Sequence, residues 1–561
     1  MVKRKYVIEK FGGIDEHSKS LSTATSMVNL CVTKERKLKK RDVLKKVISL
    51  RGEEILASWE GTIRGVECIL FVTAGGFYKY LADIGSAIYL RPFTGTRAFA
   101  FEFSECVYIL SDVDLYSFDG GSVSRVEGYS PLIAISTDFS GSCELFEAVN
   151  MLTPKRRQQF SSDGQNKKLI LLEKNIQSIV SVAYLGERLD KAEYTFNSVD
   201  STITLNEVYP ALENSLEVEY ISGADRRSEV LAFEKACVFG GGNDTRVFLF
   251  GNSEMPSYRR HSELGGGMPR ADYFPENNFV SISGKVITSI IRHYDRQLIF
   301  CLDSTFYSVD EIQSDSLGAY YHSYPIYALN SEKGHIGGND SILIKNEPIS
   351  LTYDGIYRWV STSVRDERNA IKISSNVDGI YLRFLGSRWE NPIRLYDDDI
   401  RCELWVVCGD EALIYNYELN VWYFYSDVGL VTFSRCFDRL LLGKADGDVC
   451  VFEEGEEEIP IRYISGSGGL GEVDTQKELG GIEINATSSF GTEMDISFMA
   501  DGDGECKGTF CAKFGKALSR IFRRRLLFGR FRQLAFVLDG KSNDVLISYI
   551  SFIIKERGRI F

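Results

Sequence analysis

The most informative part of the sequence is residues 404–415, in which Leu404-Trp405-Val406-Val407 is followed by a short polar turn and then by Leu413-Ile414-Tyr415. Two runs rich in β-branched and aromatic residues, joined by a turn that contains glycine, are typical of a β-hairpin. Similar pairs of runs occur at residues 69–78, 107–118, 298–307, 349–357 and 440–452. Where no other segment intervenes, successive pairs are about 36 to 55 residues apart, which is the period of four-stranded blades. The pattern predicts an all-β protein built on a β-propeller, and a string of separate β-sandwiches is the alternative.

The length and composition indicate several globular domains. The chain has 561 residues, of which 44% are hydrophobic and 25% charged, and a domain averages about 150 residues. With 65 Lys and Arg against 78 Asp and Glu, the net charge is −13, which argues against a general nucleic-acid coat or a basic membrane-surface protein. No apolar run is long enough to span a bilayer, and Met1-Val2-Lys3-Arg4-Lys5 leads into no apolar signal core. We therefore expect a soluble protein that is not exported by the usual route.

Interruptions of the repeat predict five regions. Residues 1–50 are rich in Lys and Arg and show little strand pattern, so they are expected to be an N-terminal arm. Residues 51–142 and 226–458 carry the repeat and are expected to form the propeller, with a β-sandwich domain inserted at residues 143–225. Residues 459–561 contain period-two alternation of apolar and polar side chains, which predicts a C-terminal β module.

Residues that could carry catalysis, a cofactor or a metal are scarce. The five histidines lie at no metal-binding spacing, and the 12 cysteines are scattered singly, as expected of reduced, buried thiols. Residues 466–471 match Gly-x-Gly-x-x-Gly but have no helix pattern after them, so we interpret them as a linker. Residues 501–505 are interpreted as a polar hairpin tip, and Asp397-Asp398-Asp399 as a solvated loop. The sequence predicts no catalytic, cofactor or metal site, and hence no enzyme.

Two basic clusters are candidate contact sites. The first alternates with apolar residues near the C-terminus and consists of Arg520, Arg523, Arg524, Arg525, Arg530 and Arg532. Such a surface can attract DNA phosphates or an acidic patch on a neighbouring subunit, and the negative net charge favours subunit or channel contacts over specific DNA binding. The second cluster lies in the expected arm and consists of Lys37, Lys39, Lys40 and Arg41. The arm is expected to become ordered on docking to a partner, so that removal of residues 1–45 would leave a folded monomer with reduced assembly.

Several short motifs resemble the tail and neck propeller proteins of bacteriophages that infect Gram-positive hosts. The motifs are Phe11-Gly12-Gly13-Ile14-Asp15, Asn150-Met151-Leu152-Thr153-Pro154-Lys155-Arg156, Gly241-Gly242-Asn243-Asp244-Thr245-Arg246, Tyr273-Phe274-Pro275, Asp366-Glu367-Arg368-Asn369-Ala370 and Arg530-Phe531-Arg532. The likeness covers most of the chain and includes no catalytic residue. One departure is Arg41-Asp42-Val43, where the family usually has Pro-Gly. The resemblance implies a structural protein of the virion, either a stabiliser of packaged DNA at the neck or the tubular nozzle of a short tail.

The function expected from this resemblance is mechanical. We expect a homo-oligomeric ring of six copies that is assembled in the bacterial host cytoplasm and incorporated into the virion tail or neck. The ring would contact adaptor or portal proteins, retain packaged double-stranded DNA in its lumen without sequence specificity, and provide the exit channel of the DNA; no membrane partner is expected. One alternative is a host-surface protein of the tail tip that binds glycans through loop aromatics. Another is a propeller glycosidase, which would need a pair of converging carboxylates.

Overall fold

The computed structural model describes residues 2–224, 226–240, 244–314, 320–360, 369–471, 475–502, 504–515 and 517–559. This described part is almost entirely β-structure, with two short helices, α1 (Arg227–Leu231) and α2 (Asp378–Ser387), which confirms the predicted all-β class. The chain divides into two compact units. Unit 1 consists of Met1–Glu60, Tyr80–Ala87 and Glu332–Phe561, and unit 2 consists of Gly61–Lys79 and Ile88–Ser331.

Among the described residues, seven sheets have four strands each. The three in unit 1 are β35 (Ile342–Ile344), β36 (Glu347–Thr352), β37 (Gly355–Trp359) and β38 (Ala370–Lys372); β39 (Arg394–Asp398), β40 (Glu403–Cys408), β41 (Glu411–Asn416) and β42 (Val421–Tyr425); and β43 (Leu430–Cys436), β44 (Arg439–Lys444), β45 (Asp448–Glu453) and β5 (Val43–Ser49). The three in unit 2 are β10 (Ala98–Phe103), β11 (Cys106–Ser111), β12 (Leu115–Phe118) and β13 (Val123–Arg125); β23 (Lys235–Phe239), β24 (Arg246–Phe250), β25 (Tyr258–His261) and β28 (Phe279–Ser281); and β29 (Ile287–His293), β30 (Arg296–Cys301), β31 (Thr305–Ser308) and β34 (Ile326–Asn330). The seventh sheet is β6 (Ile55–Ile63), β7 (Val66–Thr73), β8 (Gly76–Leu81) and β9 (Ser86–Pro92). Three of the four boundaries between the units fall inside its strands, and the fourth lies between Ser331 and Glu332.

The hairpin predicted at residues 404–415 is confirmed as β40 and β41. The two strands pair antiparallel, with Leu404 opposite Tyr415 and Val406 opposite Leu413. Trp405 is fully buried and packs edge-on against Phe452 of β45, at 5.3 Å between ring centroids. Every residue of β40 is buried, which explains why the sequence shows a continuous apolar run here instead of an alternating pattern.

A strand from the N-terminal region completes the sheet of β43, β44 and β45. β5 pairs antiparallel with β45, with Val43 opposite Glu453 and Asp448 opposite Ser49. The pairing satisfies the backbone of β45 along an edge that would otherwise be open to strands of other molecules. The sheet therefore depends on two segments that are about 400 residues apart in the sequence.

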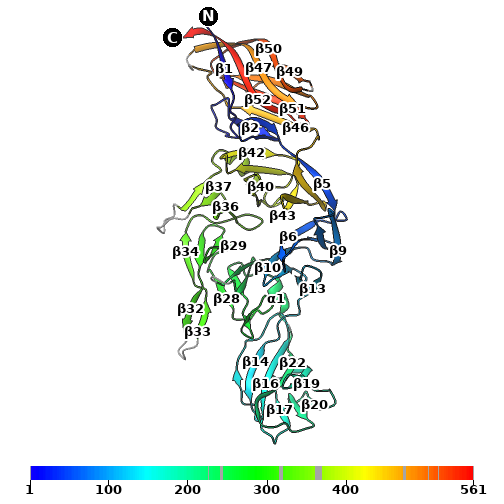
Figure 1. The fold of residues 1–561 in the computed structure, drawn as a ribbon. Coiled ribbons are helices and arrows are strands. Elements are labelled where there is room, and N and C mark those ends of the chain that lie inside the picture. The colour runs from blue at the N-terminus through cyan, green and yellow to red at the C-terminus, as the bar shows by residue number, and fades with distance from the viewer. Residues whose placement is uncertain are drawn as a thin grey trace. The chain divides into compact units, whose positions relative to one another are not determined.

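Both ends of the chain contribute to one two-layered structure, which we call the terminal module. Its first sheet is β3 (Leu30–Val32), β4 (Leu38–Lys40), β52 (Leu546–Arg559), β47 (Thr475–Ser488) and β50 (Ala517–Phe531), with β1 (Val2–Ile8) paired to β52. Its second sheet is β2 (Ala24–Val28), β46 (Ile459–Ser465), β51 (Leu534–Ser542), β48 (Thr492–Ala500) and β49 (Lys507–Phe514). The two sheets pack together through ring contacts such as that between Phe536 and Phe552, at 5.5 Å between centroids. β1, β47 and β52 lie side by side in Figure 1.

The first fifty residues are not an arm, which corrects the expectation from the sequence. They form β1 to β5, and Phe11, Ile14 and Leu38 are buried in the same hydrophobic core as the terminal module and the sheets of unit 1. The backbone N–H of Ile14 donates to the carbonyl of Trp422, at 2.8 Å. Deleting residues 1–45 would therefore remove strands from both layers of the terminal module. β2, β3 and β4 have only 5, 3 and 3 residues, and the core residues of the segment are irregularly spaced, so no period-two signal marks these strands.

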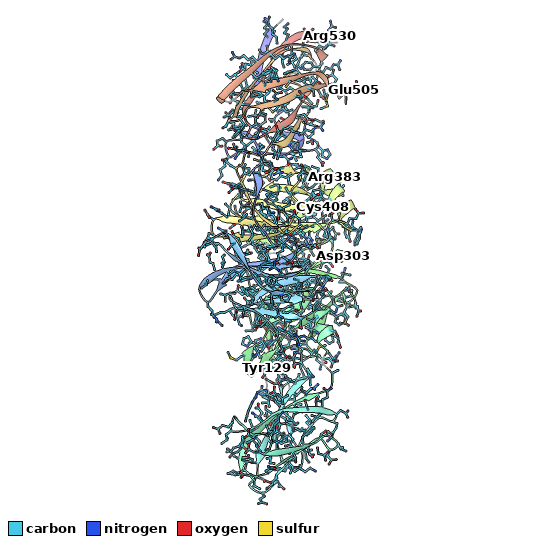
Figure 2. The ribbon with its side chains drawn as sticks, turned by 90° about the vertical axis from the view of Figure 1, so that its right-hand side faces the viewer. Tyr129, Asp303, Arg383, Cys408, Glu505 and Arg530 are labelled. Carbon is cyan, nitrogen blue, oxygen red and sulfur yellow. The ribbon has the colours of Figure 1, made fainter. Side chains whose placement is uncertain are left out.

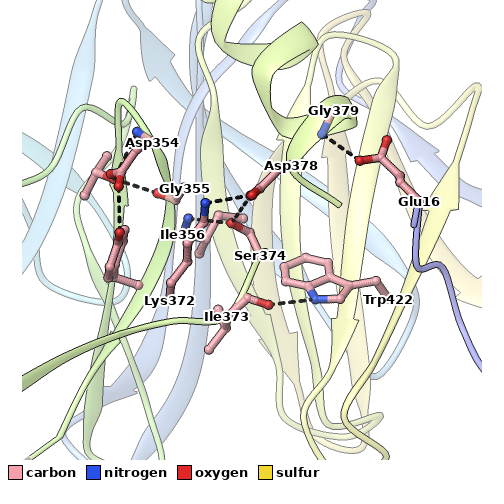
Figure 3. Close-up of polar contacts among 12 residues, drawn as sticks. Glu16, Asp354, Gly355, Ile356, Lys372, Ile373, Ser374, Asp378, Gly379 and Trp422 are labelled. Atoms are coloured by element: carbon pink, nitrogen blue, oxygen red, sulfur yellow. Dashed lines mark hydrogen bonds and ion pairs between the residues drawn. The ribbon is translucent and has the colours of Figure 1, made fainter. Parts of the chain in front are cut away.

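The N-terminal segment also caps helix α2. The Glu16 carboxylate accepts hydrogen bonds from the backbone N–H groups of Gly379 and Ile380, at 2.6 and 3.1 Å. Figure 3 shows Glu16 at the first turn of α2, together with Asp378, which accepts hydrogen bonds from Lys372 and Ser374. A carboxylate at this position satisfies free N–H groups and opposes the positive end of the helix dipole.

Residues between β13 and α1 form an inserted module of two sheets with a core of their own. One sheet is β15 (Glu144–Leu145), β14 (Leu132–Thr137), β16 (Lys155–Ser162), β22 (Leu212–Ser222), β18 (Ile176–Tyr184) and β19 (Glu187–Arg188), and the other is β17 (Lys168–Ile170), β21 (Thr202–Leu205) and β20 (Tyr194–Asn197). Phe160 and Val218 of the first sheet share a buried cluster with Leu169 and Ile203 of the second. Ile133 and Ala134 belong to the same cluster, so the module begins before residue 143.

The buried position of Phe11 gives a direct test of the N-terminal assignment. Phe11 is 1% exposed, and truncation of a buried Phe to Ala costs about 3 to 5 kcal/mol. We expect Phe11→Ala to lower the free energy of unfolding of the terminal module by about that amount, measured by urea dependence of hydrogen exchange in β52. Lys10→Ala, at an exposed neighbouring position, should change it by less than about 0.5 kcal/mol. Equal protection of β52 from exchange in Phe11→Ala and in the wild type would support the interpretation of residues 1–50 as an arm.

Candidate interaction surface

The arginine run of β50 is divided between the two faces of its sheet. Paired residues on neighbouring strands project to the same face. Arg523 pairs with Glu483 and Arg525 with Gly481, whereas Arg524 pairs with the buried Ile482. Arg524 accordingly reaches over the second sheet, where its guanidinium carbon lies 4.6 Å from the centroid of the Phe510 ring. The three consecutive arginines do not form one patch.

Arg523 and Arg525 share the outer face of the sheet with basic residues from both chain ends. One row of paired positions crosses β1, β52, β47 and β50, and it consists of Lys5, Ile553, Gly481 and Arg525. One row further along, Lys3 lies opposite Lys555, Lys555 opposite Glu478, and Glu478 opposite Arg530. We call the resulting group the basic face; its members are Lys3, Lys5, Lys555, Arg523, Arg525 and Arg530. Glu478, opposite Arg530, and Glu483, opposite Arg523, lie on the same face. The basic face therefore carries six cations and two carboxylates.

Glu483 organises the centre of the basic face. Its carboxylate accepts hydrogen bonds from Lys5 Nζ at 3.0 Å, from Arg523 Nε at 2.6 Å and from the Tyr549 hydroxyl at 2.9 Å. These contacts, led by that of Lys5, lower the pKa of Glu483 to about 2. The side chain is 10% exposed, beneath cations that are 50% and 70% exposed. Glu483 thus holds Lys5 and Arg523 in place and remains ionised at neutral pH.

Three of the other four cations of the basic face are exposed, and the fourth, Lys555, is half-buried. Lys3, Arg525 and Arg530 are exposed, and no ion pair is recorded for them within the described ranges. Arg530 is labelled in Figure 2. Arg532 is also exposed, but it follows the end of β50, where its backbone N–H donates to Asp501 at 2.7 Å. Arg520 belongs to β50, opposite Ala486, and its side chain lies outside the described part.

The four basic residues predicted to form a docking arm bind their own chain instead. Lys37 Nζ donates to the Ser548 carbonyl at 3.0 Å, and Lys39 Nζ lies 2.5 Å from a Glu454 carboxylate oxygen. Lys40 and Arg41 are buried, at 3% and 4% exposure. Lys40 Nζ donates to the Glu457 carbonyl at 2.9 Å, and Arg41 donates to Asn29 at 2.9 Å and to the Ser426 carbonyl at 3.0 Å. They anchor the N-terminal segment, which corrects the docking assignment.

The aspartate cluster at residues 397–399 is not a solvated loop. Asp397 and Asp398 end strand β39, and only Asp399 is well exposed. Asp398 is buried opposite Glu403 and lies 3.3 Å from Arg401, which also contacts Asp42 at 3.2 Å. Arg401 is therefore shared between carboxylates from β39 and from the N-terminal segment. The sequence places Asp42 about 360 residues away, so its part in this cluster could not be predicted.

Glu403 adds a buried carboxyl group to this cluster. Burial, reinforced by the nearby Asp398, raises the pKa of Glu403 to about 8, while Arg401 acts in the opposite direction. One carboxyl oxygen of Glu403 has no hydrogen-bond partner. The group is therefore mainly protonated at neutral pH.

Residues 466–471 serve as a linker, as predicted. They follow β46, and the next described element is β47, a strand. A Cβ atom on Gly466 would lie 2.6 Å from the carbonyl oxygens of both Ser18 and Ser20, so glycine allows the N-terminal segment to approach closely. No group of three or more His, Cys, Asp or Glu side chains in the described ranges is arranged to hold a metal. No described helix is both long and apolar enough to cross a membrane.

Comparisons with known proteins do not assign this chain to a family. No family model and no curated protein matches it. Among solved structures, it is similar to the computationally designed Ika8 protein, at 11% identity over 73% of this chain and 99% of that chain, with a TM-score of 0.33. It is also similar to CsCBM6-3 from Clostridium stercorarium in complex with cellobiose, at 11% identity over 22% of this chain and 86% of that chain, with a TM-score of 0.13. A third similar structure is an exo-beta-1,3-galactanase from Phanerochaete chrysosporium with galactose, at 8% identity over 80% of this chain and 95% of that chain, with a TM-score of 0.17. The low TM-scores mean that these similarities carry no argument about function.

The Glu483 network predicts a dependence of stability on acid. Because folding lowers the pKa of Glu483 to about 2, its contribution is complete above the unfolded-state pKa, about 4.5, and is lost as the pH falls toward 2. Urea denaturation of the wild type and Glu483→Gln should therefore differ most at pH 5 to 7 and converge toward pH 2. Tyr549→Phe, which removes one hydrogen bond, should give a smaller difference of the same sign. A difference independent of pH would contradict this role of the carboxylate.

The buried Glu403 predicts that stability changes with pH in the opposite direction. Its folded-state pKa of about 8 lies above the unfolded-state value, so the folded protein binds the additional proton and loses stability as the pH rises from about 4.5 to 8. We expect Glu403→Gln to remove this loss, so that it is more stable than the wild type at pH 8 but not at pH 5. Glu458→Gln, at an exposed position, is the control and should show the same change of stability with pH as the wild type. Parallel curves of unfolding free energy against pH for all three proteins would disprove the raised pKa of Glu403.

Proposed function

We propose that the chain is a structural subunit of an oligomeric assembly, of the kind found in bacteriophage tails and necks. The observation that carries the proposal is the basic face of the terminal module. The chain as a whole carries a net charge of −13. Nevertheless, six cations from the strands β1, β50 and β52 lie on one exposed face of their sheet. Such a concentration of charge favours an anionic partner, because complementary charge steers and orients association.

The proposal includes a β-propeller as the mechanical frame. Seven four-stranded sheets follow one another along the described chain, and β5 completes the sheet of β43 to β45. A final blade that takes a strand from the other end of the chain would close the ring and leave few open edges. A closed frame of this kind resists force without any catalytic residue.

The resemblance to tail and neck proteins supplies the setting. On this proposal, copies of the chain form a ring, with six subunits expected, that retains packaged double-stranded DNA and provides its exit channel in the virion. Adaptor or portal proteins would be its neighbours, and the chain would have no enzymatic role. The basic face would contact either DNA phosphates or an acidic surface of the next subunit, both through exposed cations.

The test removes three of the four cations of the basic face that take no part in the Glu483 network. The triple variant Lys3→Ser, Arg525→Ser and Arg530→Ser should fold like the wild type and form fewer oligomers at about 150 mM salt, measured by sedimentation velocity and negative-stain microscopy. A second measurement, fluorescence anisotropy of labelled duplex DNA across a salt series, distinguishes a DNA contact from a subunit contact.

The matched control removes three exposed lysines of the inserted module, as Lys168→Ser, Lys174→Ser and Lys191→Ser. This control has the same net charge as the triple variant and should assemble like the wild type. If both variants lose assembly equally, net charge and not the basic face is responsible. Unchanged assembly and DNA binding in the triple variant would refute the proposal.

A further inference from the structure

Arg259 is a fully buried cation in unit 2. It belongs to β25, and its side chain reaches residues of the next four-stranded sheet, that of β29, β30, β31 and β34. The guanidinium donates to the side-chain oxygen of Gln297, to Ser308 Oγ at 2.8 Å and to the Tyr324 carbonyl at 2.9 Å. These three acceptors are neutral, and no carboxylate within the described ranges forms an ion pair with Arg259.

The guanidinium keeps its charge at neutral pH. Burial lowers the pKa of Arg259 to about 9, which is still well above 7. The ring of Phe248, whose centroid lies 4.9 Å from the guanidinium carbon, offers only a cation–π contact. A buried charge is strongly destabilising unless an opposite charge lies beside it. Arg259 therefore requires an anion that the described side chains do not provide.

A second arginine increases the positive charge of the same sheet face. Residues two apart on a strand point to one face, so Arg259 and His261 share a face on β25, and Arg246 and Phe248 share one on β24. Phe248 pairs with His261, which makes these two faces the same. Burial lowers the pKa of His261 to about 4, so its ring is neutral at pH 7. The face carries two buried guanidinium groups.

The carboxylates of the neighbouring segments are bound to other cations. Each of three acidic residues near the junction of the two sheets has a basic partner, and Arg259 takes part in none of these contacts. The pairs are Glu263 with Arg246, Asp310 with His322, and Asp244 with Arg292. The charge of Arg259 is thus the one that remains unbalanced on this face.

Unused hydrogen-bond donors lie next to this charge. Arg259 Nε and Gln297 Nε2 are buried and have no hydrogen-bond partner. Their parent groups are bonded to each other through Arg259 Nη1 and Gln297 Oε1, so the two unused donors are close together. Ser308 lies opposite Gln297 on the neighbouring strand, and its hydroxyl, which accepts from Arg259, also has a hydrogen to donate. Buried donors left without an acceptor cost free energy.

We propose that a single chloride ion is bound between Arg259, Gln297 and Ser308. All three side chains are 0% exposed, so the site suits a monatomic anion and no larger group. A water molecule could accept the same hydrogen bonds but would leave the charge unbalanced. The ion would join two neighbouring sheets of unit 2. This site is separate from the basic face and goes beyond the proposed assembly role.

The experiment follows hydrogen exchange of the full-length chain at constant ionic strength, while sodium gluconate is replaced stepwise by sodium chloride. Gluconate is too large for a fully buried site. A ligand that binds only the folded state stabilises it as the site fills. We expect exchange in β25 and β30 to slow saturably, by at least about threefold at about 150 mM chloride. Exchange in β52, in the terminal module, is the internal control and should not respond specifically to chloride.

Gln297→Glu is the decisive variant, because it places a carboxylate beside Arg259 with almost no change in side-chain size. This carboxylate would replace the ion. We therefore expect exchange in β25 and β30 to be slow without chloride and to be independent of chloride. Arg259→Met should also abolish the chloride dependence. Arg188→Met, at an exposed arginine of unit 2, is the matched control and should respond to chloride like the wild type.

Crystals of the wild type grown in sodium bromide give a second measurement that needs no variant. An anomalous peak beside Arg259 and Gln297, with a chloride response that Gln297→Glu removes, supports the proposal. A water molecule or a carboxylate of the chain at that place overturns it. Wild-type exchange that is independent of chloride, or a chloride response that persists in Gln297→Glu, overturns it as well. Failure of the assembly role would leave all these results unchanged, because the site lies within one chain.

Discussion

Pairing between the two ends of the chain is the constraint on which unit 1 depends. β1 adds to β52, β2 to β46, and β5 to β45, so every layer that contains C-terminal strands also contains an N-terminal strand. The hydrogen bonds of these pairs close loops of several hundred residues, and the entropy of closing a loop grows only slowly with its length. Burial of Phe11, Ile14 and Leu38 in the shared core offsets that cost. The basic face exists because this pairing places Lys3 and Lys5 beside β52, on the same sheet face as Arg523 and Arg525 of β50.

The sequence predicts the parts of the fold that depend on local pattern. The hairpin at residues 404–415 and the all-β class follow from runs of β-branched and aromatic residues between short turns. The linker at residues 466–471 follows from the absence of a helix pattern. These predictions succeed because each needs only neighbours within about twenty residues. The propeller and the virion role rest on the repeat period and on the resemblance, and they stay proposals.

Long-range contacts explain what the sequence could not predict. Lys40 and Arg41 look like an exposed basic arm in the sequence, but their partners are carbonyl groups near residues 426 and 457. The arginine run looks like one patch, yet strand alternation sends Arg524 away from Arg523 and Arg525. The positions of Glu403 and Trp389 in the sequence do not mark them as unusual. Glu403 is notable because the structure buries it, and Trp389 because the structure leaves it exposed. Lys3 and Lys5 are visible in the sequence as basic residues, but only the strand register shows that they share a sheet face with the arginines of β50.

The pairing of β1 with β52 also has a consequence for biosynthesis. The ribosome makes residues 2–8 long before residues 550–556, so β1 waits without its partner until β52 has been translated. A product of premature termination would lack β52 and could not assemble the basic face. Competence to join the proposed ring is thereby restricted to polypeptides that include β52, so chains truncated before this strand are kept out of the assembly.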